Sequence, residues 1–273
     1  MSRSALVETL VEIACLAGEN ILEVYAGADA GAAVKGDGSP VTVADTAAEA
    51  VILRELAARL PEIPVVAEEE AAAGRLPDVG RRFFLVDPLD GTKEFLSRNG
   101  EFTVNIALVE DGVPVAGVVY APALGELYAG AVGEGARAAT VTAGRPAGWV
   151  RIKARAVPEA GLDVVASRSH LTDETRDFIG RFTVNDLVSA GSSLKFCRVA
   201  AGAADLYPRL GRTMEWDTAA GDAVLRAAGG QVATLDGRPL AYGKRNQADD
   251  VDFANPWFVA AGGFDPFTLA SAS

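Results

Sequence analysis

Two aspartates, Asp87 and Asp90, stand three residues apart in the segment DPLDGTKEF, directly after the hydrophobic run at 83–86. That run has the composition of a buried strand. Pro88 has no N–H and favours an extended residue before it, so we expect the strand to end at Asp87. Gly91 permits a tight turn into a short helix. Two hard oxygen ligands would then lie beside the N–H groups of a helix N-terminus, an arrangement suited to Mg²⁺ and to a phosphate.

The same segment allows two other interpretations. Aspartate and glycine are common turn residues, so the segment could simply connect a strand to a helix. The string from Leu89 to Thr92 also resembles the D-x-D-G-T sequence of haloacid-dehalogenase phosphatases, which use an aspartate as nucleophile. That pattern requires an acid two residues before Asp90, where this chain has Pro88. Proline can be neither nucleophile nor ligand, which argues against this type of phosphatase.

Composition limits the class of protein further. The chain has 273 residues, 49% of them hydrophobic, which is enough for one large domain or two small ones. A net charge of −12 without a basic stripe argues against binding to a nucleic-acid polymer. His170 is the single histidine, so most His-rich zinc sites are excluded and a Ser-His-Asp triad would depend on it. Cys15 and Cys197 are expected to be buried, reduced thiols.

The N-terminal region contains Glu8, Glu12 and Glu19, which interrupt any apolar signal-peptide core. No apolar run is long enough to span a membrane. We therefore expect a soluble, cytoplasmic protein without an integral membrane segment, and a peripheral association with the inner membrane is compatible with the sequence.

Periodicity predicts the elements around the acidic segment. Helices are expected at 4–25 and 44–60, and a strand at 63–67. Alternation at 102–108 indicates a half-buried strand, paired through a turn with a second strand at 115–120. Short strands and helices alternate in the second half, which favours an α/β layer. The Ala/Gly-rich stretch at 133–148 is expected to be a loop or domain joint, between an N-terminal α+β metal-binding domain (1–150) and a C-terminal α/β domain (151–273).

The motif DPLDGT resembles the signature of the inositol monophosphatase superfamily. The longer run GTKEFLSRNGEFTVNIALVEDGVPVAGVVYAP resembles its bacterial 3′(2′),5′-bisphosphate nucleotidases, whereas inositol monophosphatases more usually continue G-T-x-N-F. The resemblance extends from about Asn20 to about Phe258. It implies an α/β fold of the inositol monophosphatase/fructose-1,6-bisphosphatase type, layered α/β/α/β/α. The N-terminal sheet would be antiparallel and the C-terminal sheet mixed, with the active site between them.

The resemblance also implies a magnesium site. Asp87 would bridge two Mg²⁺ ions, with Glu68 and the Leu89 carbonyl completing one site. Asp90 and Asp217 would complete the other, because the segment EWDTAAG around Asp217 resembles the second family signature, W-D-x-A-A-G. Without the resemblance, Asp217 would be interpreted as the N-cap of a helix.

A third, weaker ion and the attacking water are implied near Asp45, with Thr92 and Glu68 orienting the water. Taken alone, Asp45 is an ordinary acid in the first turn of a helix, and the run from Glu68 to Glu70 is a solvated group of charges. The third glutamate, Glu70, leaves the register of the ligand open by one residue.

Substrate contacts are implied on both sides of the metal. In the first half these are Glu68, Leu89, Asp90, Gly91 and Thr92. In the second half they are Gly191, Ser192, Ser193, Lys195 and Asp217, and the serines could otherwise act as an N-cap.

The resemblance therefore implies a Mg²⁺-dependent phosphomonoesterase that converts 3′-phosphoadenosine-5′-phosphate to AMP and phosphate by two-metal activation of water, with lithium as an inhibitor. An inositol-1-phosphate phosphatase, which shares every metal ligand, is the first alternative. A carboxylate cluster that binds divalent cations without catalysis is the second. A homodimer is compatible with the sequence.

Overall fold

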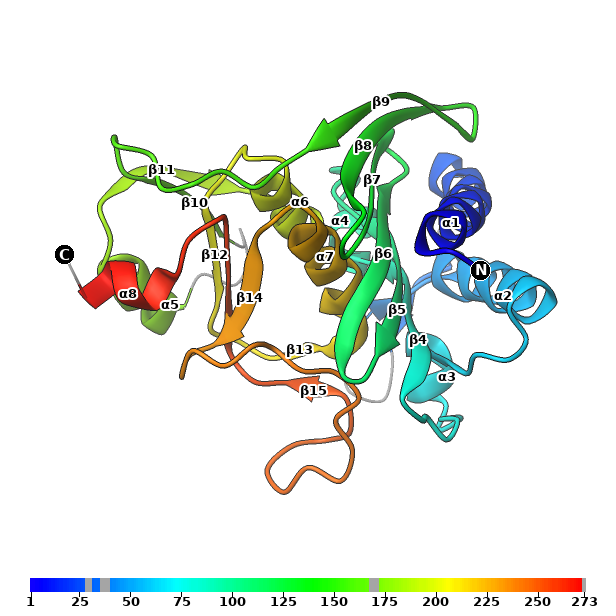
Figure 1. The fold of residues 1–273 in the computed structure, drawn as a ribbon. Coiled ribbons are helices and arrows are strands. Elements are labelled where there is room, and N and C mark those ends of the chain that lie inside the picture. The colour runs from blue at the N-terminus through cyan, green and yellow to red at the C-terminus, as the bar shows by residue number, and fades with distance from the viewer. Residues whose placement is uncertain (28–30, 35–39, 167–171, 272–273) are drawn as a thin grey trace.

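Two β-sheets and the helices that separate and flank them build the molecule (Figure 1). A computed structural model describes residues 1–27, 31–34, 40–166 and 172–271. His170, which a catalytic triad would need, lies outside the described residues.

The first sheet has seven strands in the order β3-β4-β5-β6-β7-β8-β9. They are β3 Val65–Ala67, β4 Arg82–Asp90, β5 Thr103–Glu110, β6 Val113–Ala121, β7 Glu126–Ala131, β8 Gly135–Thr142 and β9 Arg145–Ile152. All neighbours are antiparallel except β3 and β4, which run parallel. The antiparallel N-terminal sheet is thus confirmed, with one parallel edge strand.

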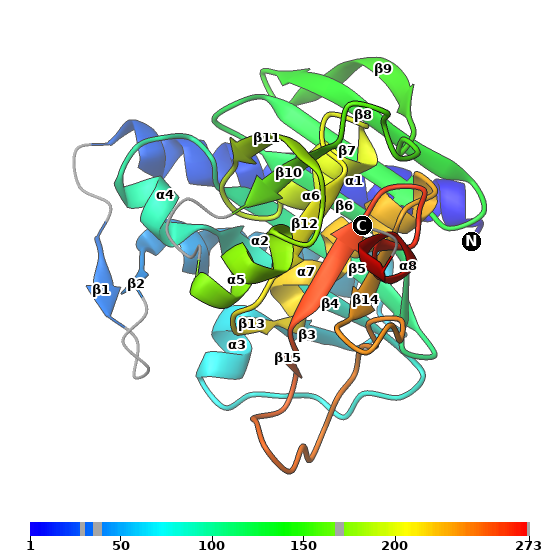
Figure 2. The same ribbon diagram turned by 90° about the vertical axis from the view of Figure 1, so that its left-hand side faces the viewer.

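The second sheet has five strands in the order β11-β10-β12-β16-β14. They are β10 Leu162–Ala166, β11 Val184–Ser189, β12 Leu206–Arg209, β14 Gln231–Thr234 and β16 Phe258–Ala261. Strand β10 runs parallel to β11 and β12, whereas β16 is antiparallel to β12 and β14, so the sheet is mixed as expected. Two short pairs complete the strands: β1 Ala33–Val34 with β2 Pro40–Val41, and β13 Thr213–Met214 with β15 Ala254–Asn255. Figure 2 shows β1 and β2 at the edge of the molecule.

Helices form the remaining three layers (Figure 1). Helices α1 Arg3–Ala26 and α2 Val43–Arg59 cover the outer face of the first sheet. Helices α6 Leu194–Ala200 and α7 Glu215–Ala227 lie between the sheets, and α5 Asp173–Ile179 and α8 Pro266–Ser271 cover the outer face of the second. Short helices α3 Glu68–Ala72 and α4 Thr92–Leu96 follow β3 and β4. The order is α/β/α/β/α, which confirms the layered fold.

Small residues let α7 approach the first sheet closely. A Cβ atom on Gly117 of β6 would come within 2.7 Å of the carbonyl oxygen of Ala220, so only glycine fits this contact. One buried cluster joins both sheets through α6 and α7, and includes Phe83, Val119, Phe196 and Phe258. The two halves therefore share a core, and the joint between them is packed.

The structure corrects three expectations about the first sheet. Strand β4 does not end at Asp87 but continues to Asp90, because a shift of register between these aspartates leaves Pro88 unpaired with β5. Strand β5 is buried on both faces rather than one, since helices cover both sides of the sheet. The stretch at 133–148 is not a loop: it forms β8 and the first half of β9, so the boundary expected at 150 falls inside a strand.

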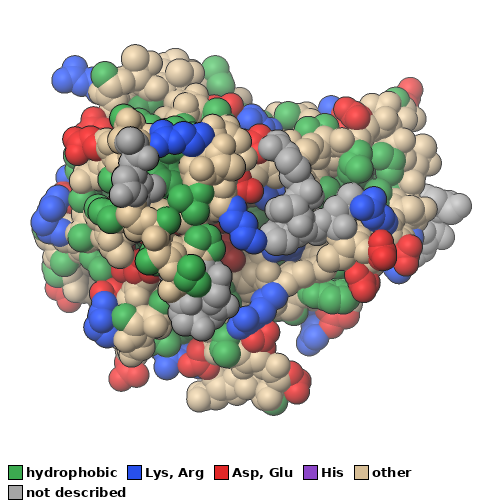
Figure 3. Space-filling view, turned by 180° about the vertical axis from the view of Figure 1, so that it is seen from behind, with side chains coloured by type: hydrophobic (Ala, Val, Ile, Leu, Met, Phe, Trp, Pro, Cys, Tyr) green, Lys and Arg blue, Asp and Glu red, His purple; other side chains and the backbone are tan. Residues whose placement is uncertain are grey.

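Both cysteines are buried free thiols, as expected. No helix among the described residues combines the length and the apolar character needed to cross a membrane. Acidic and basic side chains are interspersed on the face seen in Figure 3, and no continuous basic band crosses the described part of that face.

Candidate active site

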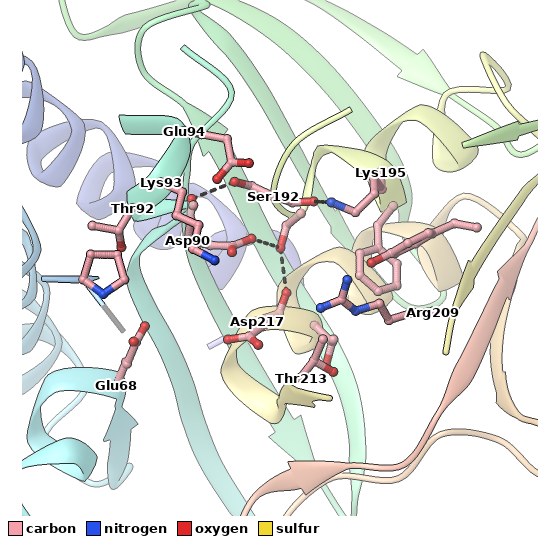
Figure 4. A pocket seen from close by; sticks show the side chains of 16 residues that line it. Glu68, Asp90, Thr92, Lys93, Glu94, Ser192, Lys195, Arg209, Thr213 and Asp217 are labelled. Atoms are coloured by element: carbon pink, nitrogen blue, oxygen red, sulfur yellow. Dashed lines mark hydrogen bonds between the residues drawn. The ribbon is translucent and has the colours of Figure 1, made fainter. Parts of the chain in front are cut away.

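A cavity of about 220 Å³ opens where the two halves meet. Residues of the first half reach it from α3, from the end of β4 and from α4, and those of the second half from α6, β12 and α7. In Figure 4, Asp90 and Asp217 lie between Glu68 on one side and Lys195 and Arg209 on the other. Segments far apart in the chain thus bring anionic and cationic side chains to one hollow.

The end of β4 supplies the central carboxylates. Asp87 is 1% exposed, and one of its oxygens, Oδ1, accepts a hydrogen bond of 3.0 Å from the Leu89 N–H. The register shift that follows Asp87 leaves Leu89 without a partner in β5, so its carbonyl lies outside the regular ladder. Asp90, the last residue of the strand, lines the cavity.

Burial and neighbouring charges raise the pKa values of the three aspartates Asp87, Asp90 and Asp217. Burial, then the charges of Glu68, Asp90 and Asp217, raises the pKa of Asp87 well above its ordinary value. Burial, then Asp90 and Glu68, does the same to the pKa of Asp217. Burial raises the pKa of Asp90 to about 6, although Lys195 opposes the shift. The pKa values of Asp87, Asp90 and Asp217 are therefore all raised beside neighbouring carboxylates, and a bound cation would stabilise their ionised state.

The donor set fits magnesium. Every candidate ligand is a carboxylate or carbonyl oxygen, the type of ligand that Mg²⁺ prefers. Within the described ranges, no group of three or more His, Cys, Asp or Glu side chains is arranged so that it could hold a metal ion. The fit therefore rests on the chemistry of the donors and on their mutual electrostatic influence.

Asp217 has a structural role as well. It is the third residue of α7, not its N-cap; the N-cap is Met214, whose N–H donates to Asp217 Oδ2 at 2.7 Å. One carboxylate oxygen thus fixes the first turn of the helix. The interpretation of Asp217 as the N-cap is wrong by three positions, while its carboxylate still lines the cavity.

Thr92 of α4 and Asp45 of α2 are joined by a hydrogen bond. Gly91 takes the left-handed conformation (φ 94°) that turns the chain from β4 into α4, and Thr92 is the first residue of that helix. The Thr92 hydroxyl donates to Asp45 Oδ1 at 3.3 Å. The other oxygen of Asp45 accepts from the Thr42 N–H at 2.8 Å and from its hydroxyl at 2.6 Å. Asp45 is thereby held in place and orients Thr92 at the edge of the cavity.

The three glutamates of the acidic run are partly exposed and differ in their surroundings. Residues Glu68, Glu69 and Glu70 form the first turn of α3, and the structure separates their roles. Glu68 lines the cavity, whereas Glu70 accepts two hydrogen bonds, at 2.6 and 2.7 Å, from Arg75 away from it. Of these three glutamates, Glu68 lines the cavity, and the register of the metal ligand stays a prediction.

Sequence reasoning missed Glu49. This residue of α2 is 4% exposed, and its carboxyl accepts hydrogen bonds from the N–H groups of Glu69 at 2.8 Å and Glu70 at 3.0 Å. Burial raises its pKa from 4.5 to about 7. Glutamate is usually a surface residue in an amphipathic helix, so its residue type gave no sign that it is buried.

We expect Glu49→Gln to change how stability depends on pH. The folded protein keeps the Glu49 proton up to about pH 7, while the unfolded chain loses it near 4.5, so wild-type stability falls as pH rises across this interval. Glutamine cannot ionise, so the variant should gain stability relative to wild type between pH 4.5 and pH 7. Denaturant unfolding at pH 5 and pH 8 checks this. A stability difference that is the same at both pH values would show that the raised pKa is wrong.

Lys195 and the serines Ser192 and Ser193 line the cavity. Lys195 is 6% exposed, its ammonium donates to the Ser192 carbonyl at 2.6 Å, and burial lowers its pKa to about 8. Ser193 occupies the N-cap position of α6, yet its hydroxyl makes no hydrogen bond to that helix. The serine hydroxyls bond instead to residues of the cavity wall, as described below.

Arg209 was also missed. It ends β12, beside Tyr207, and lines the cavity opposite the carboxylates. Its NH2 group donates to the Arg212 carbonyl at 3.2 Å, and its buried Nε has no hydrogen-bond partner among the described residues. The available signal was a basic residue eight positions before Asp217.

The sequence model of the inositol monophosphatase family matches residues 2–259. The chain belongs to the inositol monophosphatase family. It is 46% identical over 254 residues to the 3′(2′),5′-bisphosphate nucleotidase CysQ of Salmonella typhimurium, covering 93% of this chain and 98% of the relative. Identity to the Escherichia coli K12 protein of the same name is 43%, with the same coverage.

Solved structures of similar fold also belong to this family. CysQ from Bacteroides thetaiotaomicron, a bacterial member of the family, superposes with a TM-score of 0.78 at 38% identity, covering 95% of this chain and 98% of that one. The inositol monophosphatase of Anabaena has a TM-score of 0.74 at 27% identity, covering 98% and 95%. The family implies a Mg²⁺-dependent phosphatase, in agreement with the oxygen donors of the cavity.

Proposed function

We propose that this member of the inositol monophosphatase family is a Mg²⁺-dependent 3′(2′),5′-bisphosphate nucleotidase that converts 3′-phosphoadenosine-5′-phosphate to AMP and phosphate. The observation that carries the proposal is the polarity of one cavity. Carboxylates for a metal gather at one end, and the cations Lys195 and Arg209 line the other. A substrate with two phosphates matches both ends, and the relatives named as bisphosphate nucleotidases support the choice.

Five residues would hold two Mg²⁺ ions. Asp87 is shared, Glu68 and the Leu89 carbonyl belong to one ion, and Asp90 and Asp217 to the other. When bound, the ions would supply positive charge that activates a water and stabilises the leaving oxygen in an in-line displacement. The two halves of the chain each contribute ligands, so the site is complete only when they are packed together.

Thr92 orients the water. Its hydroxyl is already fixed by Asp45, which in turn is fixed by Thr42. Glu68 lines the cavity from α3 and can accept a proton from the same water. A third, weaker Mg²⁺ near Asp45 would fit the same carboxylate. None of these groups must form a covalent bond to phosphorus.

The second phosphate would bind at the cationic end. Arg209 has a buried Nε without a partner in the described part of the chain, and Lys195 lies within 5.4 Å of the Tyr207 ring centre beside it. Gly191 and Ser192 shortly precede Lys195 in sequence, and their backbone N–H groups are further candidate donors. Charge-assisted hydrogen bonds from such donors favour a phosphate over a neutral hydroxyl.

The predicted cytoplasmic location and the homodimer stay predictions.

Substrate preference tests the proposal. We expect kcat/KM for 3′-phosphoadenosine-5′-phosphate to exceed that for inositol-1-phosphate by at least about tenfold, equivalent to ~1.4 kcal/mol of transition-state binding. Phosphate release measured for both substrates at saturating Mg²⁺ decides the matter. Equal values, or a preference for inositol-1-phosphate, would make the chain an inositol phosphatase instead.

Arg209→Met should lower kcat/KM for the substrate with two phosphates more than for a substrate with one. Losing charged hydrogen bonds to the second phosphate is expected to lower kcat/KM for 3′-phosphoadenosine-5′-phosphate roughly tenfold to a hundredfold. Adenosine 3′-monophosphate lacks the 5′-phosphate, so its kcat/KM should change less than about threefold. An equal loss on both substrates would place Arg209 elsewhere in the mechanism.

A further inference from the structure

Two consecutive serines of the second half, Ser192 and Ser193, hydrogen-bond to the carbonyl oxygen and to the carboxylate of Asp90. The Ser192 hydroxyl lies 2.8 Å from the Asp90 carbonyl oxygen and 2.7 Å from that of Glu101. The Ser193 hydroxyl lies 3.0 Å from Asp90 Oδ2 and 2.6 Å from the Asp217 carbonyl oxygen. Ser192 adopts a left-handed conformation (φ 47°), which is uncommon for a residue with a side chain. A Cβ atom on Gly91 would collide with the Ser192 hydroxyl, so the fit here is close.

A third residue determines how the Ser193 hydroxyl points. Asn105 of β5 donates its Nδ2 hydrogen to Ser193 Oγ at 3.0 Å. Asn105 is fully buried and Ser193 is 2% exposed, so neither finds an alternative in bulk solvent. A hydroxyl has a single hydrogen to donate. Since Ser193 accepts from Asn105, its one hydrogen is shared between Asp90 Oδ2 at 3.0 Å and the closer Asp217 carbonyl oxygen at 2.6 Å.

Asn105 has a buried polar side chain that packing alone does not explain. The following residues on the same face of β5 are Ala107 and Val109, which are buried and apolar. Asn105 Oδ1 is buried and has no hydrogen-bond partner among the described residues. An unpaired buried acceptor destabilises a fold, so a side chain selected for packing alone would be apolar. Asn105 also sits directly opposite Asp87 in the β4–β5 ladder, beside the shared carboxylate.

We propose that Asn105 and Ser193 are positioning residues for the magnesium site. Asn105 orients the Ser193 hydroxyl, which fixes the carboxylate of Asp90 relative to the first turn of α7, where Asp217 stands. The inference rests on the proposed function, in which Asp90 and Asp217 share one Mg²⁺. It assigns the Ser193 hydroxyl to the metal ligands rather than to the sugar or second phosphate of the substrate. Groups that orient metal ligands typically change metal affinity tenfold to a hundredfold when removed.

Magnesium binding without substrate is the discriminating measurement. Titration calorimetry with Mg²⁺ on the full-length protein should show about tenfold weaker binding for Ser193→Ala and for Asn105→Ala. At saturating Mg²⁺, KM for 3′-phosphoadenosine-5′-phosphate should stay within about twofold of wild type. The double variant should bind Mg²⁺ no more than about twofold more weakly than Ser193→Ala, because both changes remove one linked pair of hydrogen bonds. Thr175→Val, which removes a buried hydroxyl from α5, is the matched control and should leave Mg²⁺ binding unchanged.

Three results would overturn the inference. Wild-type Mg²⁺ affinity in Ser193→Ala with a raised KM would make Ser193 a substrate contact. Multiplied losses in the double variant would mean that Asn105 acts independently of Ser193. If the wild-type protein itself binds no Mg²⁺, the proposed function fails together with the inference, and this outcome is recognised before any variant is compared. Asn105→Leu, which keeps the volume but has no donor, replaces Asn105→Ala if the alanine variant does not fold.

Discussion

Asp90→Asn is expected to lower kcat/KM for 3′-phosphoadenosine-5′-phosphate by about a thousandfold or more while the protein stays folded. Asparagine keeps the size of the side chain and one oxygen, but it removes a unit of negative charge from the ligands of one ion. Asp90 also carries part of the repulsion that raises the pKa of Asp87. In a chelating buffer the variant should therefore unfold at a temperature no lower than wild type, since a source of repulsion is gone.

Activity, Mg²⁺ titration and thermal unfolding are measured together for this variant. The titration is needed because a weakened ligand can recover part of its activity at high Mg²⁺. Asp111→Asn is the matched control: Asp111 pairs with Arg81 at the exposed turn between β5 and β6, and its loss should leave activity unchanged. An Asp90→Asn protein that keeps more than about a tenth of wild-type kcat/KM at low Mg²⁺ would exclude Asp90 from the metal site.

The second large effect separates two glutamates on one short helix. Glu68→Gln should lower kcat/KM by about a hundredfold or more, because Glu68 is proposed both to hold a metal and to help orient the water. Glu70→Gln should change it less than about twofold, because Glu70 pairs with Arg75 outside the cavity. Glu69→Gln is expected to fall between them.

Steady-state rates across a Mg²⁺ series measure all three glutamine variants under the same conditions. The comparison is internal, since the side chains share a helix, a charge and a size. A damaging Glu70→Gln beside a silent Glu68→Gln would move the ligand by two residues and would require a different orientation of α3.

Much of the fold followed from local patterns. The strong 3.6-residue period of α1 and α2 predicted both helices to within two residues at each end. Strand β8 was missed because glycine and alanine in this part of the sheet lack the branched side chains by which strands are usually recognised. The burial of both faces of β5 could not be predicted from its alternation, since it depends on α7, which comes more than a hundred residues later in the chain.

Some residues of the candidate site could likewise be predicted from local sequence, and others could not. Asp87 and Asp90 could be identified as candidates from the sequence because the two carboxylates stand three residues apart, beside a turn. Glu49 and Asn105 were not visible, because each acts through a hydrogen bond to a residue 20 or more positions away. The hydroxyls of Ser192 and Ser193 bond with Asp90 of the first half, and these contacts depend on how the two halves pack.

Hydrolysis of 3′-phosphoadenosine-5′-phosphate by the purified protein, with product identification, tests the central claim most directly. With Mg²⁺ present, the account predicts stoichiometric AMP and inorganic phosphate, and with excess chelator it predicts no reaction. Activity that persists in chelator, or a Mg²⁺-loaded protein that leaves the bisphosphate intact, would contradict it.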